Sequence, residues 1–455
     1  MNHFLKLQGL CAAALLVAAG MSNSASALGL KESLAAAYNN NPTLQAARNQ
    51  LRATDEQVPQ ARSNYFPTVT NNTTAGRDWL QQQAVFGVGA TLNPREESLI
   101  VSEPVYRGGR TQAEIEKAEN LVKAGREQLT VTEQNVLLAA ATAYMDVYRD
   151  QAVLDLNINN EQVLRRQLEA TQDQFRVGEV TRTDVSQAEA RLAQATAARI
   201  QAEGTLNSSR AVYRNVTGIT PTKLDAPEEL QGLPGTADES IAASAQNPTV
   251  LFATFNEQAA QNDVDINFGE LLPTLSVNGE YDHDDDTISK GSTLDNKALT
   301  AQLSVPLYPG SAVYSRVRAA KETVKQLRNQ TNQAKQDAAQ QATQAFESYT
   351  AALAQVKSFE KQIQANTIAL EGVRQEATVG ARTVLDILNA ELELLNSQVS
   401  QVQAKHDTWV AGFQLKVAIG QLTAQAFEVP VQQYNVETHY NEVHDKLWGT
   451  GGDNH

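Results

Sequence analysis

The sequence predicts an elongated α+β fold in which one unit of strands and long helices occurs twice. Proline is absent from two very long stretches, 105–220 and 310–429. Such stretches favour very long helices, because proline breaks the helical hydrogen-bond ladder. Apolar and polar residues alternate with a period of two before the second stretch, and less regularly before the first. This alternation is the pattern of a strand with one apolar face.

An internal duplication relates the two units. Pro42 and Pro67 are 25 residues apart, and so are Pro248 and Pro273. Farther along, the offset between equivalent residues settles at 202, as in Pro104 and Pro306, Tyr106 and Tyr308, Gly178 and Gly380, Asp184 and Asp386, and Gly218 and Gly420. A long repeat with a constant offset is a stronger signal than any single motif.

Four segments of the mature chain follow from this repeat. They are a first repeat at 28–218, a linker at 219–237, a second repeat at 238–420 and a C-terminal segment at 421–455. The linker is marked by its content of proline and glycine. The last residues, 449–455, are polar and glycine-rich, and we expect them to be disordered.

Residues 1–27 have the features of a secretory signal peptide. Lys6 precedes an apolar stretch, and Ala25-Ser26-Ala27 is a small-x-small cleavage site. The apolar stretch is too short to cross a bilayer as a helix. Cleavage would remove Cys11, the only cysteine, so packing and assembly must stabilise the exported chain without disulfides.

Composition narrows the class of protein further. The formal net charge is −15, and loss of Lys6 with the signal peptide would bring it to −16, which argues against nucleic acid as a partner. Aromatic residues make up only 6%, so thin helical walls are expected rather than one thick core. No later stretch is apolar enough for a transmembrane helix, and any membrane crossing must therefore use β-strands.

Short helices are expected at the start of the mature chain. The first should break at the asparagines before Pro42. The second should run from Thr43 to about Ser63 with a kink at Pro59, because proline disturbs a helix interior. Pro67 should end this region, since the residue before a proline leaves the helical conformation.

A strand pair should follow in each unit. The clearest strands are 275–282 and 298–307, and their first-unit equivalents are about 66–75 and 96–105. Each has roughly the ten residues that a tilted strand needs to cross a bilayer. A pair of soluble hairpins is the alternative interpretation, because membrane strands give a weak signal individually.

Polar loops are expected between the paired strands, at 77–95 and 283–296. Residues 282–286 read Asp-His-Asp-Asp-Asp. A solvated loop is favoured over a divalent-cation site there, because the acidic residues follow no recognised ligand spacing.

Long helices are then expected at 109–175 and 310–376. Small and apolar residues recur there at steps of three and four, which is typical of coiled-coil packing. A continuous helix of this length would extend about 100 Å. Turns at 176–183 and 377–383 should reverse the chain into returning helices.

The two turns share a motif. Val177-Gly178 and Val379-Gly380 are followed by aspartates, Asp184 and Asp386, six residues after each glycine. Glycine supplies the positive φ that ends a helix. A surface loop between coiled-coil arms is the alternative, but two copies at one offset favour a functional element.

Threonines supply the candidate N-caps of the returning helices. They are Thr181 or Thr183 in the first turn and Thr383 in the second. A threonine hydroxyl at this position satisfies a free backbone N–H of the first helical turn.

Assembly is required if the strands enter a membrane. Four strands cannot close a barrel, and open strand edges are not viable in lipid. Two chains would supply eight strands and three would supply twelve, both permitted numbers. The helices must then project from an outer membrane into the periplasm, with the turns at their far end.

These features resemble the TolC family of outer-membrane channel-tunnels over nearly all of the mature chain, from Leu30 to Leu422. The resemblance is carried by the sequences at 41–44 (NPTL), 53–56 (ATDE), 58–62 (VPQAR), 104–109 (PVYRGG) and 379–389 (VGARTVLDILN). The last motif is most similar to the branch that serves type I protein secretion, which also exports drugs.

The resemblance implies an α+β membrane protein that forms a homotrimer. Four strands per chain would build a 12-stranded β-barrel, continuous with a hollow α-helical coiled-coil barrel. The linker 219–237 and the segment 421–455 would lie in an equatorial region. The protein would act as an exit duct in the outer membrane of a Gram-negative bacterium, for type I protein secretion, multidrug efflux or both.

The same resemblance implies the partners. They are outer-membrane lipid, a periplasmic adaptor (membrane fusion) protein and an inner-membrane ABC or RND transporter. Substrates would pass without chemistry, and no cofactor or metal is expected. The transporter delivers the cargo, so this chain does not specify the cargo, the transporter or the adaptor.

A gate at the turns is implied as well. The positions that close the periplasmic end in the family are Asp184, Arg382 and Asp386 here, with Thr183 beside Asp184. Independently, an acidic ring repeated by symmetry favours cations at a narrow mouth. Arg382 can hold a carboxylate or a carbonyl in a charge-assisted hydrogen bond.

Two positions depart from the family pattern, and two pairs are candidate adaptor contacts. Asn389 stands where a second constricting aspartate is frequent, and Ala377 stands where an aromatic latch residue is frequent. The acidic ring would be weaker and the latch connected differently. The turn residues Val177-Gly178 and Val379-Gly380 are the candidate adaptor contacts.

An enzyme is disfavoured by the sequence. The mature chain holds five histidines and no cysteine, and it shows no nucleophile motif. His439 and His444, with Glu442, are spaced so that the histidines do not share a helix face. The stronger alternative is a soluble periplasmic coiled-coil adaptor or structural protein, which would explain the helices but not the strands or the duplication.

Overall fold

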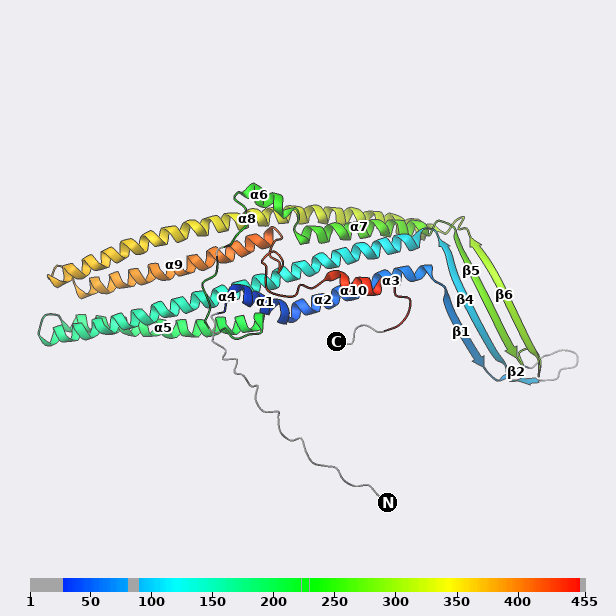
Figure 1. Ribbon diagram of the computed structural model, residues 1–455, viewed down its shortest axis with the longest axis horizontal. Helices are drawn as coiled ribbons and strands as arrows, with labels where there is room; N and C mark the ends of the chain where they lie inside the picture. The colour runs from blue at the N-terminus through cyan, green and yellow to red at the C-terminus, as the bar shows by residue number, and fades with distance from the viewer. Residues whose placement is uncertain (1–27, 81–89, 222, 229, 451–455) are drawn as a thin grey trace, which may run out of the picture.

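The computed structural model describes residues 28–80, 90–221, 223–228 and 230–450. The predicted signal peptide and the end of the predicted disordered tail lie outside these residues. Figure 1 shows an elongated molecule with a sheet at one end and two long helical hairpins that reach the other end. The strands lie at a steep angle to the helices.

The first repeat begins with three short helices, and both predicted strands are present. Its elements are α1 (Leu30–Asn40), α2 (Pro42–Asp55), α3 (Gln57–Arg62), a 3-10 turn (Ser63–Tyr65), β1 (Thr68–Ala75), β2 (Asp78–Leu80), β3 (Ala90–Leu92), β4 (Arg95–Arg107), α4 (Arg110–Arg176) and α5 (Arg182–Thr217).

The second repeat has the same order with fewer interruptions. Its elements are α6 (Ala237–Ser244), α7 (Pro248–Gly269), β5 (Thr274–Asp285), β6 (Thr293–Ser304), α8 (Ser311–Thr378) and α9 (Val384–Ala418). A last helix, α10 (Val436–Val443), lies in the C-terminal segment.

Two local expectations were wrong. The helix predicted from Thr43 to Ser63 is divided at Glu56, rather than kinked at Pro59. Pro59 is the third residue of α3, and it has no N–H to donate to the carbonyl four residues before it, so the preceding turn ends first. The loops are also shorter than predicted, because β2 and β3 form a small hairpin within 77–95 and β5 extends to Asp285.

The sheet is antiparallel with the order β1-β4-β5-β6. Cross-strand pairs such as Leu99 with Tyr281 and Leu275 with Leu303 place large apolar side chains on one face. Many of these are exposed, including Leu299 at 80%. On the other face the Ser102 hydroxyl donates to the Asn278 side-chain oxygen at 2.7 Å. The predicted alternation of an apolar and a polar face is therefore confirmed.

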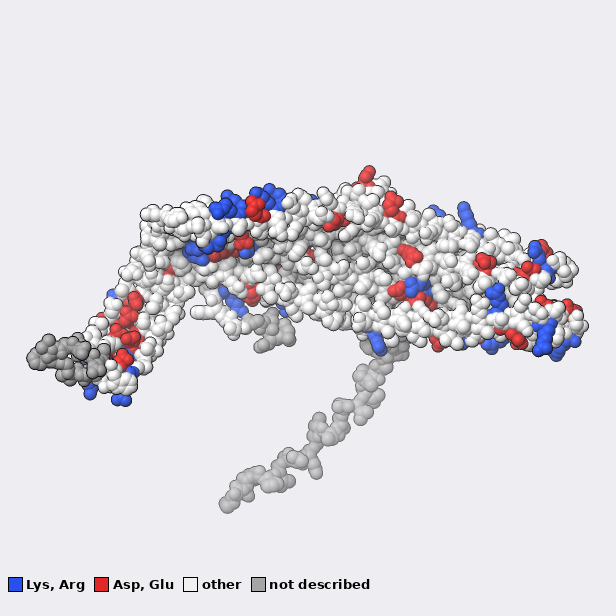
Figure 2. Space-filling view, turned by 180° about the vertical axis from the view of Figure 1, so that it is seen from behind, with Lys and Arg blue, Asp and Glu red and all other residues white. Residues whose placement is uncertain are grey.

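Acidic side chains gather on the part of the sheet farthest from the helices (Figure 2). The strands carry them at their ends, as Glu96 and Glu97 of β4 and Asp282, Asp284 and Asp285 of β5. Their distribution separates a charged rim of the sheet from its apolar middle.

The main core lies midway along the helices, where α1, α4, α5 and α9 meet the C-terminal segment. Tyr144, Tyr213 and Phe413 are completely buried there. The Tyr213 hydroxyl hydrogen-bonds the Ser33 hydroxyl at 2.7 Å, and the Tyr144 hydroxyl donates to the Asp225 carbonyl at 2.7 Å. These contacts fasten the start of the described chain and the linker to the long helices.

None of the described helices combines the length with the apolar character that a membrane span requires.

Candidate functional site at the hairpin tips

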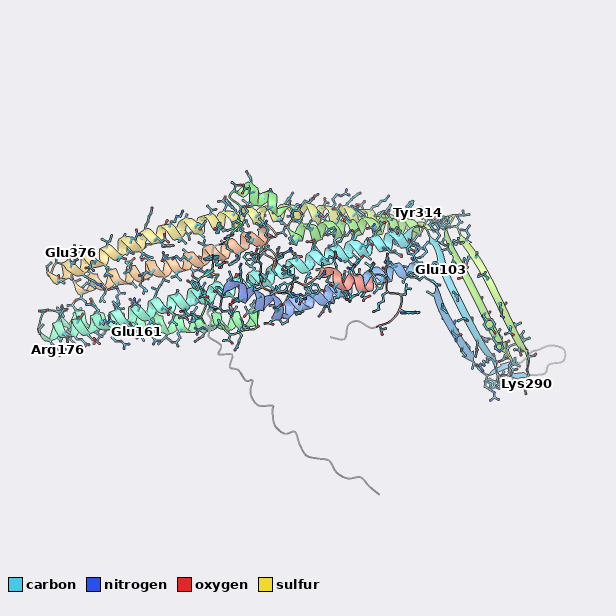
Figure 3. The ribbon with its side chains drawn as sticks, viewed as in Figure 1. Glu103, Glu161, Arg176, Lys290, Tyr314 and Glu376 are labelled. Atoms are coloured by element: carbon cyan, nitrogen blue, oxygen red, sulfur yellow. The ribbon has the colours of Figure 1, made fainter. Side chains whose placement is uncertain are left out.

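The helical hairpins end in two turns at the same extremity of the molecule. Arg176 and Glu376, at the ends of α4 and α8, mark these tips in Figure 3. Val177 is 71% exposed and Val379 is 79% exposed. Large apolar side chains are thus presented to solvent where the sequence predicts adaptor contacts.

Both incoming helices end in the same way. Gly178 and Gly380 adopt φ values of +80° and +78°, a left-handed conformation that glycine adopts without steric cost. Their N–H groups donate to the carbonyls of Phe175 and Ala377, each at 3.0 Å. The following residue in each turn donates to the carbonyl five positions earlier, which completes a Schellman motif. Ala377 therefore acts here through its backbone.

Both outgoing helices begin with a capping box. Thr181 is the N-cap of α5, so Thr183 is not, and Thr383 is the N-cap of α9. In α5, Asp184 Oδ2 accepts from the Thr181 backbone N–H at 2.8 Å and from its hydroxyl at 2.7 Å. In return, the Asp184 N–H donates to the Thr181 hydroxyl at 3.3 Å. The reciprocal bonds satisfy backbone groups that a helix start otherwise leaves free.

Asp386 repeats this arrangement in α9. Its Oδ2 accepts from the Thr383 N–H and hydroxyl, both at 2.9 Å. The hydrogen bond from the Thr383 backbone lowers the pKa of Asp386, and the Thr383 hydroxyl and the nearby Arg382 charge act in the same direction. Asp386 therefore keeps its negative charge near neutral pH.

Arg382 contacts its own hairpin in this chain. Its Nε donates to Glu376 Oε2 at 2.8 Å, across the turn from the end of α8. Both side chains are about half exposed. The hydrogen bond to Glu376 raises the pKa of Arg382. Sequence reasoning missed Glu376, although the tight turn that Gly380 predicts brings residues six apart together.

Asn389 takes part in a contact between the two hairpins. Arg191 of α5 donates from Nη2 to Asn389 Oδ1 at 2.9 Å. These residues come from different repeats, and no local signal in the sequence links them. Arg191 was not among the predicted site residues.

The other candidate sites hold ordinary structural contacts. His439 Nδ1 lies 3.2 Å from Asp55 Oδ2, and His444 Nε2 lies 2.8 Å from Asp445 Oδ2. At the end of β5, the Asp286 side chain accepts a hydrogen bond from the Gly291 N–H. Within the described ranges no three His, Cys, Asp or Glu side chains are grouped to hold a metal ion.

The fold and the tips together define a subunit of an outer-membrane channel that extends through the periplasm as a helical tube. The chain belongs to the outer membrane efflux protein family, whose model matches residues 34–218 and 241–421. The predicted resemblance and fold class are thereby confirmed.

Individual relatives cover almost the whole chain. The outer membrane efflux protein BepC of Brucella suis is 33% identical over 447 residues, which span 97% of this chain and 96% of that protein. Outer membrane protein TolC of Vibrio cholerae is 26% identical, over 90% of this chain and 95% of its own length. The Campylobacter jejuni CmeC outer membrane channel superposes with a TM-score of 0.78 at 15% identity, covering 91% of this chain and 89% of that structure.

Family membership establishes the setting of the tips. The protein is a trimeric channel of the Gram-negative outer membrane, and its helical barrel extends into the periplasm. It serves efflux or secretion together with a periplasmic adaptor and an inner-membrane transporter. The alternative of a soluble periplasmic coiled-coil protein is not favoured.

Proposed function

We propose that the hairpin tips are the closed gate of this duct, and that docking of the adaptor and transporter opens it. The proposal rests on the observation that the two tips have the same backbone construction. Each has a Schellman turn, an exposed Val-Gly apex and a capping box that an aspartate completes. Three subunits would present six such tips in a ring. A partner that binds the tips could move them apart.

The charged side chains at the tips supply a closing force of limited strength. Arg382 and Glu376 are about half exposed, and an exposed ion pair contributes at most about 1 kcal/mol. In the closed trimer of this proposal, Arg382 would exchange Glu376 for Asp184 or Asp386 of a neighbouring hairpin. A gate closed by such exposed pairs can be released by a binding partner, because the free-energy difference between its states is small.

The apices support the proposed adaptor contact. The side chains of Val177 and Val379 are the exposed apolar groups closest to the glycines. Contacts made by these side chains and by the backbone of Gly178 and Gly380 would bury apolar area without disturbing the capping boxes behind them.

The first prediction concerns conductance. Arg382→Ala should leave the trimer intact and raise single-channel conductance in a planar lipid bilayer severalfold, because one closing charge per subunit is lost. Arg176→Ala is the control, since Arg176 is another exposed tip arginine, and it pairs with Asp173 of its own helix. Equal conductance of the Arg382 variant and the wild type would place the closing contact elsewhere.

The second prediction concerns ion selectivity. Asp386→Asn should lower the cation preference, measured as a shift of the reversal potential toward zero in a KCl gradient. Asparagine removes the charge but keeps an oxygen that accepts from Thr383. Asp386→Ala would also remove the carboxylate that accepts from the Thr383 N–H and hydroxyl in the capping box, so the asparagine variant is the cleaner test. An unaltered reversal potential would contradict an acidic ring at this position.

The duct carries its cargo without covalent change in this proposal. The family is one of outer membrane efflux proteins. The hydrogen-bond partners of Asp184, Arg382, Asp386 and Asn389 are Thr181, Glu376, Thr383 and Arg191. Whether protein, drug or both pass through is decided by the transporter that delivers them. The assay is export of a reporter cargo from cells, which should depend on the partner transporter when this chain is held constant.

A further inference from the structure

The start of the described chain is fastened to the linker between the repeats. Leu28 packs against the main core and forms an isolated parallel β-bridge with Leu224. Its N–H donates to the Lys223 carbonyl at 2.9 Å, and its carbonyl accepts from the Asp225 N–H at 3.3 Å. The buried Tyr144 of α4 donates to the same Leu28 carbonyl at 3.1 Å. The backbone of Leu28 is therefore held in one place, midway along the helices.

Cleavage of the predicted signal peptide would create the chain end at this place. The small-x-small site puts the cut after Ala27, so that Leu28 becomes the first residue. Its amide nitrogen then becomes an α-ammonium, which is positively charged at neutral pH because the usual pKa of such a group is about 7.7–8.0. The ammonium keeps a hydrogen for the Lys223 carbonyl. Processing thus adds a charge at a position that the fold already holds.

Glu32 of α1 lies where it can meet this charge. Its Oε2 accepts a hydrogen bond from the Gly29 N–H at 3.0 Å. The nitrogens of Leu28 and Gly29 are three covalent bonds apart along the backbone, so they are separated by less than about 4 Å. A carboxylate that reaches one nitrogen is therefore close to the other, and a bond from an ammonium to a carboxylate is charge-assisted.

The surroundings of Gly29 hold more carboxylates than cations. Gly29 borders a cavity of about 840 Å³. The carboxylates that line this cavity are those of Glu32, Asp225, Glu228 and Glu428, and its lysines are Lys31 and Lys416. The Lys416 ammonium donates to neutral oxygens, the Gly232 carbonyl at 2.7 Å and Gln421 Oε1 at 3.3 Å. Among the described residues, none of the four carboxylates forms an ion pair with a lysine or an arginine. Negative charge is thus in excess where cleavage supplies a positive one.

We propose that signal-peptide cleavage supplies a structural cation, the Leu28 α-ammonium, which pairs with Glu32 and fixes the start of the mature chain to the linker. The precursor makes the same backbone contacts without this charge, so processing stabilises the junction of the two repeats. The proposal does not depend on the gate, because this junction lies at the main core and not at the hairpin tips.

The second repeat offers a counterpart without a chain end. Glu239 corresponds to Glu32, and a serine follows each of them. The Oε2 of Glu239 accepts from the Gly235 N–H at 2.8 Å, just before α6. The chain continues through Gly235, so no ammonium arises there. Glu239→Gln is therefore the matched control for Glu32→Gln, and glutamine keeps an oxygen that accepts from the glycine in both places.

The first test measures the reactivity of the new amine in the wild-type trimer. Mass spectrometry of the mature protein should identify Leu28 as the first residue. An ion-paired amine stays protonated, and only the neutral form reacts with an acylating reagent. Acylation of the Leu28 amine should be about tenfold slower in the folded trimer than in the unfolded chain, which corresponds to about one pKa unit. Glu32→Gln should restore most of the rate, and Glu239→Gln should leave it slow.

The second test moves the charge and keeps the fold. Insertion of Gly-Ser between Ala27 and Leu28 displaces the ammonium by two residues, while the Leu28 N–H still donates to Lys223. Without the ion pair in each subunit, the melting temperature of the detergent-solubilised trimer should fall by about 2–4 °C. Glu32→Gln should lower it in the wild-type background and have little further effect in the insertion background. Glu239→Gln should act equally in both.

The outcomes decide the proposal independently of the gate. A Leu28 amine that reacts as fast in the folded trimer as in the unfolded chain would overturn it, and so would a mature protein that begins at another residue. An effect of Glu32→Gln that is as large with the insertion as without it would show a hydrogen bond to Gly29 and no ion pair. The conductance of the Arg382 variant still tests the gate, because none of these changes lies at the tips.

Discussion

Replacing Gly108 with alanine is expected to prevent assembly of a stable channel, whereas the same change at the adjacent Gly109 should be tolerated. Gly108 has a φ of +66° and Gly109 a φ of +77°. Both alanines would carry a similar conformational cost of about 1–2 kcal/mol. A Cβ at Gly108 would lie 2.3 Å from the Gly269 carbonyl oxygen, while no described atom outside the neighbouring residues lies within 4 Å of one at Gly109.

The contact matters because of its position in the fold. Gly108 lies between β4 and α4, and Gly269 ends α7 shortly before β5. The strand–helix junctions of the two repeats therefore touch through their backbones, which cannot move aside as a flexible side chain can. The clash also meets Leu272 Cβ at 3.0 Å. A shift of either junction would change the angle between the sheet and the helices.

Trimer stability distinguishes the two variants. We expect Gly108→Ala to lose more than about 4 kcal/mol of stability, the range reserved for severe strain, and to yield no heat-sensitive trimer on gels. Gly109→Ala should form the trimer with a modestly lower melting temperature. A Gly108→Ala trimer as stable as the Gly109 variant would show that the junctions are not in firm contact.

Elements with a local cause were predictable from the sequence. The strands follow from their alternation, and the long helices from the absence of proline. The ends of α4 and α8 follow from Gly178 and Gly380. The spacing of threonine and aspartate in a capping box would have chosen Thr181 over Thr183, because Asp184 lies three residues after Thr181.

Contacts between repeats could not be predicted in the same way. Arg191 and Asn389 are 198 residues apart, and their meeting depends on how two hairpins pack. The approach of Gly108 to Gly269 likewise depends on the crossing of two junctions. Both cases need the relative position of elements, which neither hydrophobic period nor turn chemistry specifies.

A histidine in the helical barrel provides a pH-dependent contact that sequence reasoning also missed. His406 of α9 is 8% exposed. Its Nε2 lies 2.9 Å from Asp146 Oδ1 of α4, and its Nδ1 lies 2.9 Å from Asp407 Oδ1. Ionised carboxylates only accept hydrogen bonds, so both ring nitrogens must carry protons. His406 is therefore an imidazolium that joins α9 to α4.

The groups around His406 together raise its pKa above the usual value of histidine. Burial alone would lower the pKa of His406, and the nearby Arg149 acts in the same direction. The hydrogen bonds to Asp146 and Asp407 outweigh both, so the net effect raises the pKa. Arg149 is in turn held by Asp146 at 3.0 Å and by Asp150 at 2.7 Å, and Asp150 accepts from Ser209 of α5.

The sign of the pH dependence follows from this shift. A group whose pKa is raised by folding stabilises the folded state fully below its unfolded pKa, about 6.5 for histidine. The stabilisation is lost as the pH rises through the higher folded pKa. His406→Gln should therefore be less stable than wild type below pH ~6.5, by about 1.5–3 kcal/mol for charged hydrogen bonds. The difference should shrink at alkaline pH.

Thermal unfolding of the detergent-solubilised trimer, followed by circular dichroism across this pH range, measures the effect. His444→Gln is the matched control, because His444 lies at the end of α10 and pairs with the exposed Asp445, away from the contact between α4 and α9. A His406→Gln variant whose deficit stays constant with pH would show that the histidine packs as a neutral ring. A deficit of the His406→Gln variant that grows with rising pH would contradict the imidazolium. Glutamine does not titrate, so the advantage of the wild type should fall as His406 loses its proton.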